Sequence, residues 1–176
     1  QALAQRHADR VEELQRRGVD VAVLPMGSLG NIKKGSRLPS PRALVATWAL
    51  AGRVASEGRA MRVLYANSQK AFVVAALAGF RCERPVVWHL RDLLGPPHFS
   101  TLNTRAVVML ANRGAARVIV NSQATAAAFA AHGGQRAKVR VVHNGIDAAP
   151  FDAAPASDFV DTCEPLGDIA GGADTG

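Results

Sequence analysis

Hydrophobic and polar positions along the chain follow two alternating periods. Apolar residues spaced three or four apart predict helices over residues 2–17, 41–57, 68–79, 101–113 and 122–133. Short runs rich in Val, Ile and Leu predict strands over residues 19–25, 62–66, 85–89, 117–120 and 139–143. Because strands that alternate with helices are typical of parallel sheets, the pattern predicts an α/β fold with a parallel sheet and helices on both faces.

Residues that favour helix ends flank these segments. Ser40, followed by Pro41, predicts an N-cap with a proline in the first turn, and Ser68 and Ser122 predict two further N-caps. Gly18 and the Gly133-Gly134 pair predict the points where two helices end. These local signals support the helical segments independently of the apolar periodicity.

The sequence divides into a long basic part and a short acidic end. Residues 1–147 contain 21 Lys or Arg and eight acids, whereas residues 148–176 contain six acids and no Lys or Arg. We predict that residues 1–147 form one domain, with a loop at 26–40, and that residues 148–176 are a disordered or extended tail. The basic charge favours a polyanionic partner, although a solvated basic surface explains it equally well.

Missing motifs exclude several function classes. No stretch approaches the roughly 20 apolar residues of a membrane-spanning helix, and the charged N-terminal segment is unlike a signal peptide. Cys82 and Cys163 lie far apart and the histidines show no HExxH spacing, so we expect no metal site. The chain contains neither GxGxxG nor GxSxG. We therefore expect a cytoplasmic protein without a bound cofactor.

Polar residues follow four of the five predicted strands. They are Asn67-Ser68, His89-Leu90-Arg91-Asp92, Asn121-Ser122 and His143-Asn144-Gly145-Ile146-Asp147. Since ligands of open parallel sheets bind beyond the carboxyl ends of the strands, these loops predict one ligand-binding edge. Ser68 and Ser122 also lie at predicted helix N-termini, where unpaired N–H groups attract an anion. Simple helix capping is the alternative interpretation of either serine.

The segment from His89 to Asp92 holds the densest group of chemically active side chains. Strand alternation places His89 and Arg91 on the same side of the chain, with Asp92 beyond them. A His beside a carboxylate can act as an acid or base near neutral pH, and Arg is suited to phosphate oxygens. These three are therefore the candidate catalytic residues. The alternative is an Arg91–Asp92 surface ion pair beside a partly buried His89.

Three segments carry the most specific pattern in the chain. They are Pro85-Val-Val-Trp-His-Leu-Arg-Asp92, Ala116-Arg-Val-Ile-Val-Asn-Ser122 and Lys138-Val-Arg-Val-Val-His-Asn-Gly-Ile-Asp147. In this order and spacing, they resemble the N-terminal domain of family 4 glycosyltransferases, and the resemblance covers residues 8–152. It implies the Rossmann-like N-terminal half of a GT-B fold in a retaining enzyme. The donor substrate of such an enzyme is a nucleotide sugar, and its acceptor is a glycan or a lipid-linked molecule.

The resemblance also implies a division of labour between two domains. In that family the N-terminal domain binds the acceptor, and a second domain binds the donor through a pair of Glu separated by seven residues. This chain has Glu only at positions 12, 13, 57, 83 and 164. The donor-binding domain is therefore expected to be missing and this fragment to be inactive alone. The family's first strand is likewise expected before Gln1.

The resemblance assigns residues to the cleft between the two domains. Many members carry a catalytic His where the best register places Arg91, with His89 two residues earlier, so the role of His89 stays open. The implied substrate-cleft residues are Asn67, Ser68, Ser122, Asn144, Gly145 and Asp147.

Two other interpretations stay open. The first is a non-enzymatic basic module that binds an anionic membrane surface or another polyanion. Its segment 41–57, with Arg42, Trp48 and Arg53, would lie peripherally on the inner face of the cell membrane, unless it is an ordinary sheet-covering helix. Nucleic acid is not an expected partner, because only 5% of residues are aromatic. The second is a gene fragment or frameshifted product, suggested by the charge change after Asp147.

Overall fold

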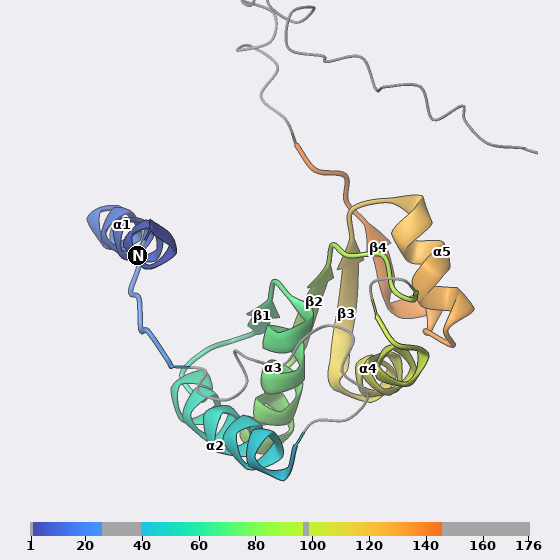
Figure 1. Cartoon of the computed structure of the whole chain (residues 1–176), viewed down its shortest axis with the longest axis horizontal. Helices are drawn as coiled ribbons and strands as arrows, with labels where there is room; N and C mark the ends of the chain where they lie inside the picture. Colours follow the sequence, from blue (N-terminus) through green and yellow to red (C-terminus); the bar gives the residue numbers. More distant parts are fainter. Residues whose placement is uncertain (1, 26–39, 97–98, 146–176) are drawn as a thin grey trace, which may run out of the picture. The chain divides into compact units, whose positions relative to one another are not determined.

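A computed structural model describes residues 2–25, 40–96 and 99–145. Its elements, in chain order, are α1 (Ala2–Arg16), α2 (Pro41–Gly58), β1 (Leu64–Ala66), α3 (Gln69–Cys82), β2 (Val86–Leu90), α4 (Thr101–Gly114), β3 (Ala115–Val120), α5 (Gln123–Ala131), the 3-10 helix η2 (Arg136–Lys138) and β4 (Val139–Val141) (Figure 1). Residues 1–143 form one unit and residues 144–176 a second, of which only Asn144 and Gly145 are described. The tail predicted over residues 148–176 lies outside the described residues, as do positions 26–39 of the predicted loop.

The four described strands form one parallel sheet in the order β1-β2-β3-β4. The register pairs Ala66 with Trp88, Trp88 with Val118 and Val120 with Val141. Each strand lies beside its predecessor, and crossover connections between parallel strands are right-handed, so the three intervening helices must lie on one face. The predicted α/β fold class with a parallel sheet is confirmed. Within the described residues α3, α4 and α5 pack on a single face of the sheet, and the helices expected on the second face are not found there (Figure 1).

The main core lies between this face of the sheet and the three helices. Strand alternation buries Trp88 and its neighbours on the helical side, while Tyr65 and His89 point to the other side. The Trp88 ring stacks on Phe72 of α3, with 4.4 Å between ring centroids, and meets Phe129 of α5 edge-on at 6.3 Å. Trp88 therefore joins two helices to the sheet.

Helix α2 packs on α3 rather than joining the main core. Leu50 and Ala51 of α2 pack on Val74, and Ala55 packs on Ala78 and Cys82. Small side chains at these positions let the two helices approach closely, which stabilises α2 mainly through contacts with α3. The outer side of α2 is left facing solvent.

Local capping signals predicted the helix starts well. The side-chain oxygens of Ser40, Ser68 and Ser122 each accept a hydrogen bond of 3.2 Å from the backbone N–H three residues later. Gly18 adopts a left-handed φ of 76° directly after α1, as a glycine that ends a helix does. The predicted helix ends at Gly18 and Gly133 are likewise confirmed.

Two sequence predictions about segment boundaries are wrong. Residues 19–25 form no strand, because none of the described strands lies beside them to complete a hydrogen-bonded ladder. Leu24 packs instead against the cluster of Leu50 and Val74. Helix α3 continues past Gly79 to Cys82, because Gly79 serves close packing rather than a helix end: a side chain there would collide with Val86 Cγ2.

Candidate functional site

The loops that follow β1, β2 and β3, three of the four predicted to carry the chemistry, lie at one edge of the sheet. Because the strands are parallel, all their carboxyl ends lie at this edge (Figure 1). Ala66 pairs with Trp88, so the next residue along each strand places Asn67 level with His89. Leu90 pairs with Val120, which in the same way places Arg91 level with Asn121. Adjacent strands are about 4.8 Å apart. The fold therefore brings the ends of β1, β2 and β3 within reach of one small ligand.

Two helices begin at this edge and point their N-termini toward it. Ser68 caps α3 and Ser122 caps α5, as the sequence predicts. A cap satisfies one of the four N–H groups that a helix leaves without an internal partner. The remaining first-turn N–H groups and the helix dipoles give the edge a positive potential.

The Ser122 cap is extended into a small hydrogen-bonded network that the sequence analysis missed. The Ser122 hydroxyl lies 2.9 Å from the Thr125 hydroxyl, which in turn donates to Asn121 Oδ1 at 3.1 Å. Thr125 is buried, so this network is anchored in the core. A Thr three residues after a capping Ser was the available sequence signal, since position N3 faces the cap.

Tyr65 and His89 form a second contact that sequence reasoning did not find. The Tyr65 hydroxyl lies 2.6 Å from His89 Nδ1, and the two rings meet edge-on with 6.0 Å between centroids. The pair lies at the carboxyl ends of β1 and β2, on the face opposite Trp88. His89 is half-buried, whereas Tyr65 is exposed. This contact fixes the direction of the imidazole ring.

The hydroxyl of Tyr65 also selects the tautomer of His89. A phenolic O–H is the better donor of the pair, so it donates to Nδ1 and leaves the proton of a neutral imidazole on Nε2. The Nε2–H of His89 is then the ring group left for a ligand. Such a group can donate a hydrogen bond to a hydroxyl or phosphate oxygen at this edge.

Replacing Tyr65 with Phe is expected to release His89 from this single tautomer. No other hydrogen bond to the ring is formed within the described residues, so the Nδ1–H and Nε2–H forms should then interconvert. The stability cost should be about 0.5–1 kcal/mol for one exposed hydrogen bond. Long-range ¹H–¹⁵N spectra of the His89 ring distinguish the two forms. His132, which lies elsewhere, should give unchanged signals, and unchanged His89 signals would contradict the assignment.

Arg91 and Asp92 follow β2 directly and both are exposed. Arg91 forms no hydrogen bond or ion pair with any other residue that the structure describes, so the alternative of an Arg91–Asp92 ion pair is not formed. Asp92 does have an interaction partner. The guanidinium of Arg91 can therefore meet an anionic ligand at the edge without first breaking a contact.

The structure does not place the other predicted cleft residues relative to this edge. Asn144 and Gly145 follow β4 and belong to the second unit. Asp147 lies outside the described residues.

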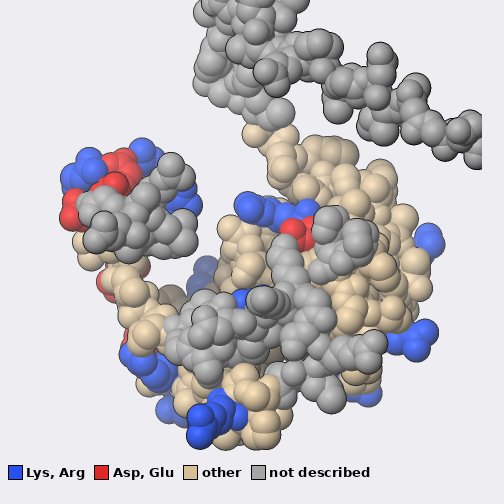
Figure 2. Space-filling view, viewed as in Figure 1, with Lys and Arg blue, Asp and Glu red and all other residues tan. Residues whose placement is uncertain are grey.

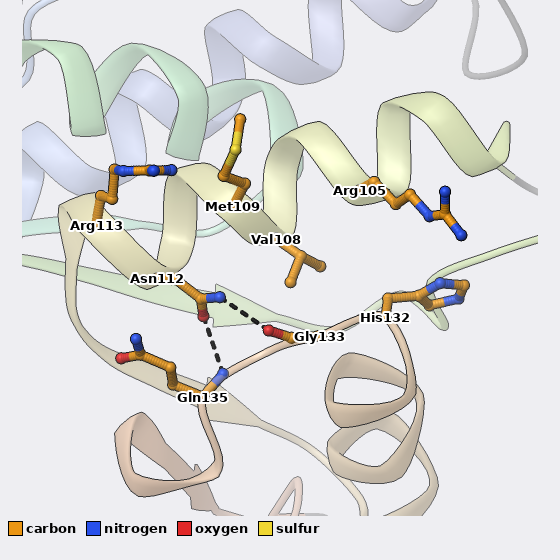
Figure 3. A pocket seen from close by; sticks show the side chains of 8 residues that line it. All are labelled: Arg105, Val108, Met109, Asn112, Arg113, His132, Gly133 and Gln135. Atoms are coloured by element: carbon orange, nitrogen blue, oxygen red, sulfur yellow. Dashed lines mark hydrogen bonds between the residues drawn. The ribbon is translucent and has the colours of Figure 1, made fainter.

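A separate hollow of about 400 Å³ lies between α4 and the turn after α5 (Figure 3). The Asn112 side chain joins α4 to the turn after α5 at the base of this hollow. It donates to the Gly133 carbonyl at 2.8 Å and accepts from the Gln135 N–H at 2.9 Å. Arg105, Met109 and His132 line its walls. None of the site residues predicted from the sequence lines this hollow.

Neither a metal cluster nor a membrane-spanning helix occurs in the part of the chain that the structure describes. No group of three or more His, Cys, Asp or Glu in residues 2–25, 40–96 and 99–145 is placed to share a metal ion. No helix within those residues is long and apolar enough to cross a membrane.

Comparison with known proteins finds a matching family model and similar solved structures. Residues 1–145 match the family described as Glycosyl transferase 4-like domain. Crystal structures of Anabaena Alr3699/HepE are similar: the complex with UDP-glucose has 37% identity and a TM-score of 0.63, and the complex with UDP has 38% and 0.62. A third, with UDP and glucose, has 39% and 0.61. Each alignment covers 78% of this chain and 34% of the Alr3699/HepE chain, so this chain spans about a third of the length of these structures. No curated protein matches.

Proposed function

Because this chain belongs to the glycosyl transferase 4-like family, we propose that it is the acceptor-binding N-terminal domain of a retaining glycosyltransferase. The observation that carries this proposal is the convergence of His89, Arg91 and the capped start of α5 on one sheet edge. An edge that combines a cation, helix N-termini and a His suits a substrate with hydroxyl and phosphate groups.

The donor is proposed to be a nucleotide sugar, with UDP-sugars as the first candidates. The similar Alr3699/HepE structures hold UDP-glucose or UDP, and this chain spans about a third of their length. The donor is expected to be held mainly by a second domain, through residues that these 176 do not contain. The acceptor, a glycan or a lipid-linked molecule, is proposed to bind at the edge built from β1, β2 and β3.

The chemistry of transfer gives the edge residues specific tasks. Breaking a bond between a sugar and a diphosphate builds negative charge on the departing phosphate, while the sugar becomes oxocarbenium-like. Fixed cations and helix N-termini stabilise that charge most when they are placed in advance. Arg91 and the N-terminus of α5 are the candidates for this task, and Nε2–H of His89 is the candidate hydrogen-bond donor to substrate. Asp92 completes the group of candidate catalytic residues.

Purified residues 1–176 are expected to transfer no sugar from UDP-glucose to any acceptor. Without the second domain, the chain neither encloses the diphosphate of the donor nor positions it against an acceptor. Such positioning supplies much of the rate enhancement. Radiolabelled UDP-glucose with glycan and polyprenyl-phosphate acceptors measures transfer directly. Calorimetry of the same chain with UDP-glucose should show binding weaker than about 1 mM.

The control for this prediction is a longer chain that includes the flanking coding region, which is first sequenced. Translation in all frames should reveal a strand-led domain with two Glu separated by seven residues, and transfer should appear when that domain is expressed in one chain with residues 1–176. Transfer by residues 1–176 alone would overturn the proposed inactivity, and flanks without such a domain would overturn the transferase assignment.

A second candidate function is binding to an anionic surface without catalysis. The specific observation is charge: residues 40–145 carry fourteen Lys or Arg and only three acids, namely Glu57, Glu83 and Asp92. In Figure 2 most of the visible acidic side chains gather on α1 instead. Such an excess raises the local concentration of polyanions near the surface.

A further inference from the structure

The outer side of α2 exposes a group of large apolar side chains. Leu44 is 55% exposed, Val45 70% and Trp48 56%, and they lie within one turn of each other. The side of α2 that carries Leu50, Ala51 and Ala55 is buried against α3 and adjoins the exposed group on the helix surface. Helix α2 is therefore apolar on two sides, although only one of them has a protein partner among the described residues.

The exposed group faces away from the sheet. Trp48 contacts Arg81 of α3, and Arg81 lies nine residues after Phe72, which is two and a half helical turns. Phe72 points to the sheet and stacks on Trp88, so Arg81 points to the opposite side of α3. Additional strands beside β1 would extend the sheet, not cover this side of α2. The apolar group thus belongs to the outer surface of the helical layer.

The indole of Trp48 is held in place by a cation. The Arg81 guanidinium carbon lies 4.6 Å from the centre of the Trp48 ring, and Arg81 Nη1 lies 3.5 Å from the Trp48 carbonyl oxygen. Gly52, one turn after Trp48, leaves room for this guanidinium, which lies 3.4 Å from where a Cβ would be. Ordering of an exposed Trp by a neighbouring Arg lowers the entropy that the side chain loses when it meets a partner.

The charges around the apolar group have one sign. Arg42 and Arg53 are exposed on α2 and Arg81 adds a third cation, whereas the single acid of α2, Glu57, lies about 13 Å along the helix from Trp48. An apolar patch with Trp, bordered by Arg, is typical of helices that lie in the interface of an anionic bilayer. A protein partner would need acidic residues placed opposite these arginines. A phosphatidylglycerol surface, in contrast, carries negative charge at every point.

We propose that Leu44, Val45 and Trp48, with Arg42, Arg53 and Arg81, form a docking surface for an anionic lipid bilayer. The apolar side chains enter the interface and the guanidinium groups contact lipid phosphates. This deepens the second function proposed above and does not require transferase activity. In an enzyme with a lipid-linked acceptor, the same surface would hold the sheet edge near its substrate.

Fluorescence of the 176-residue chain with vesicles tests the surface directly. The chain has two Trp, and Trp88 is fully buried, so Trp48 reports on contact with lipid. Vesicles of phosphatidylcholine with 30% phosphatidylglycerol, a test composition of about one charge per three lipids, should shift its emission to shorter wavelength. Pure phosphatidylcholine vesicles should not. Trp48→Phe should abolish the shift and leave co-sedimentation largely intact.

Matched charge variants separate insertion from general attraction. Val45→Asp should weaken co-sedimentation with anionic vesicles by about tenfold or more, because it places a charge in the inserted face. Met109→Asp, at a position on α4 that is 54% exposed, makes the same change in net charge and should weaken it far less. The proposal is overturned if the two variants lose equal affinity, if anionic vesicles leave Trp48 emission unchanged, or if single-stranded RNA produces the same shift.

Discussion

Replacing Trp88 with Ala is expected to destabilise the domain by about 3–5 kcal/mol, the usual cost of deleting a large buried aromatic side chain. Trp88 is fully buried and contacts Phe72 of α3 and Phe129 of α5. Its removal leaves a cavity at the point where β2 holds two helices to the sheet. Since small domains are stable by only about 5–15 kcal/mol, the variant should be close to unfolding.

Urea unfolding followed by circular dichroism measures this loss, because the variant lacks the core fluorophore. Trp88→Phe is the matched control: the indole Nε1 makes no hydrogen bond within the described residues, so Phe gives up volume but no polar contact. It should cost about 1–2 kcal/mol, in the range of partial core truncations. An alanine variant that unfolds at the same urea concentration as the phenylalanine variant would show that Trp88 does not organise the core.

The helices could be predicted from the sequence because their signals are local. Ser40, Ser68 and Ser122 each cap a helix through an N–H only three residues away, so no distant contact decides the outcome. Residues 19–25 have the composition of a strand but are not one. A parallel strand exists only where a neighbour completes its hydrogen bonds, and that neighbour is not encoded in the segment itself.

The candidate site could be predicted only in part for the same reason. The rule that loops after parallel strands share one edge placed Asn67, Arg91 and Ser122 correctly with respect to the sheet. The contact between Tyr65 and His89 depends on the register of β1 against β2, which brings together residues 24 positions apart. Register is determined by packing of the whole face, so inspection of either strand alone would not reveal the pair.

The turn after α5 is built from two glycines that serve different purposes. The Gly133 N–H donates to the Ala130 carbonyl at 3.0 Å, and the Gly134 N–H reaches back to the Phe129 carbonyl at 3.0 Å. This is the Schellman arrangement, in which the residue after the C-cap, here the one after His132, is left-handed. Gly133 accordingly has φ of 86°, with open space where a side chain would be. At Gly134 a Cβ would instead overlap the Phe129 ring and lie 2.6 Å from its carbonyl oxygen.

Gly134→Ala is therefore expected to cost about 2–3 kcal/mol, near the upper end for an added methyl group in a tight core. Phe129 cannot yield, because it is fully buried against Trp88. Gly133→Ala should cost about 1 kcal/mol, since only the backbone is strained there. Asparagine separates the two causes in urea unfolding: Gly133→Asn should recover most of the loss because Asn tolerates a left-handed φ, whereas Gly134→Asn should be no better than Gly134→Ala. Recovery at position 134 would show that backbone conformation, and not the Phe129 ring, excludes side chains from the turn.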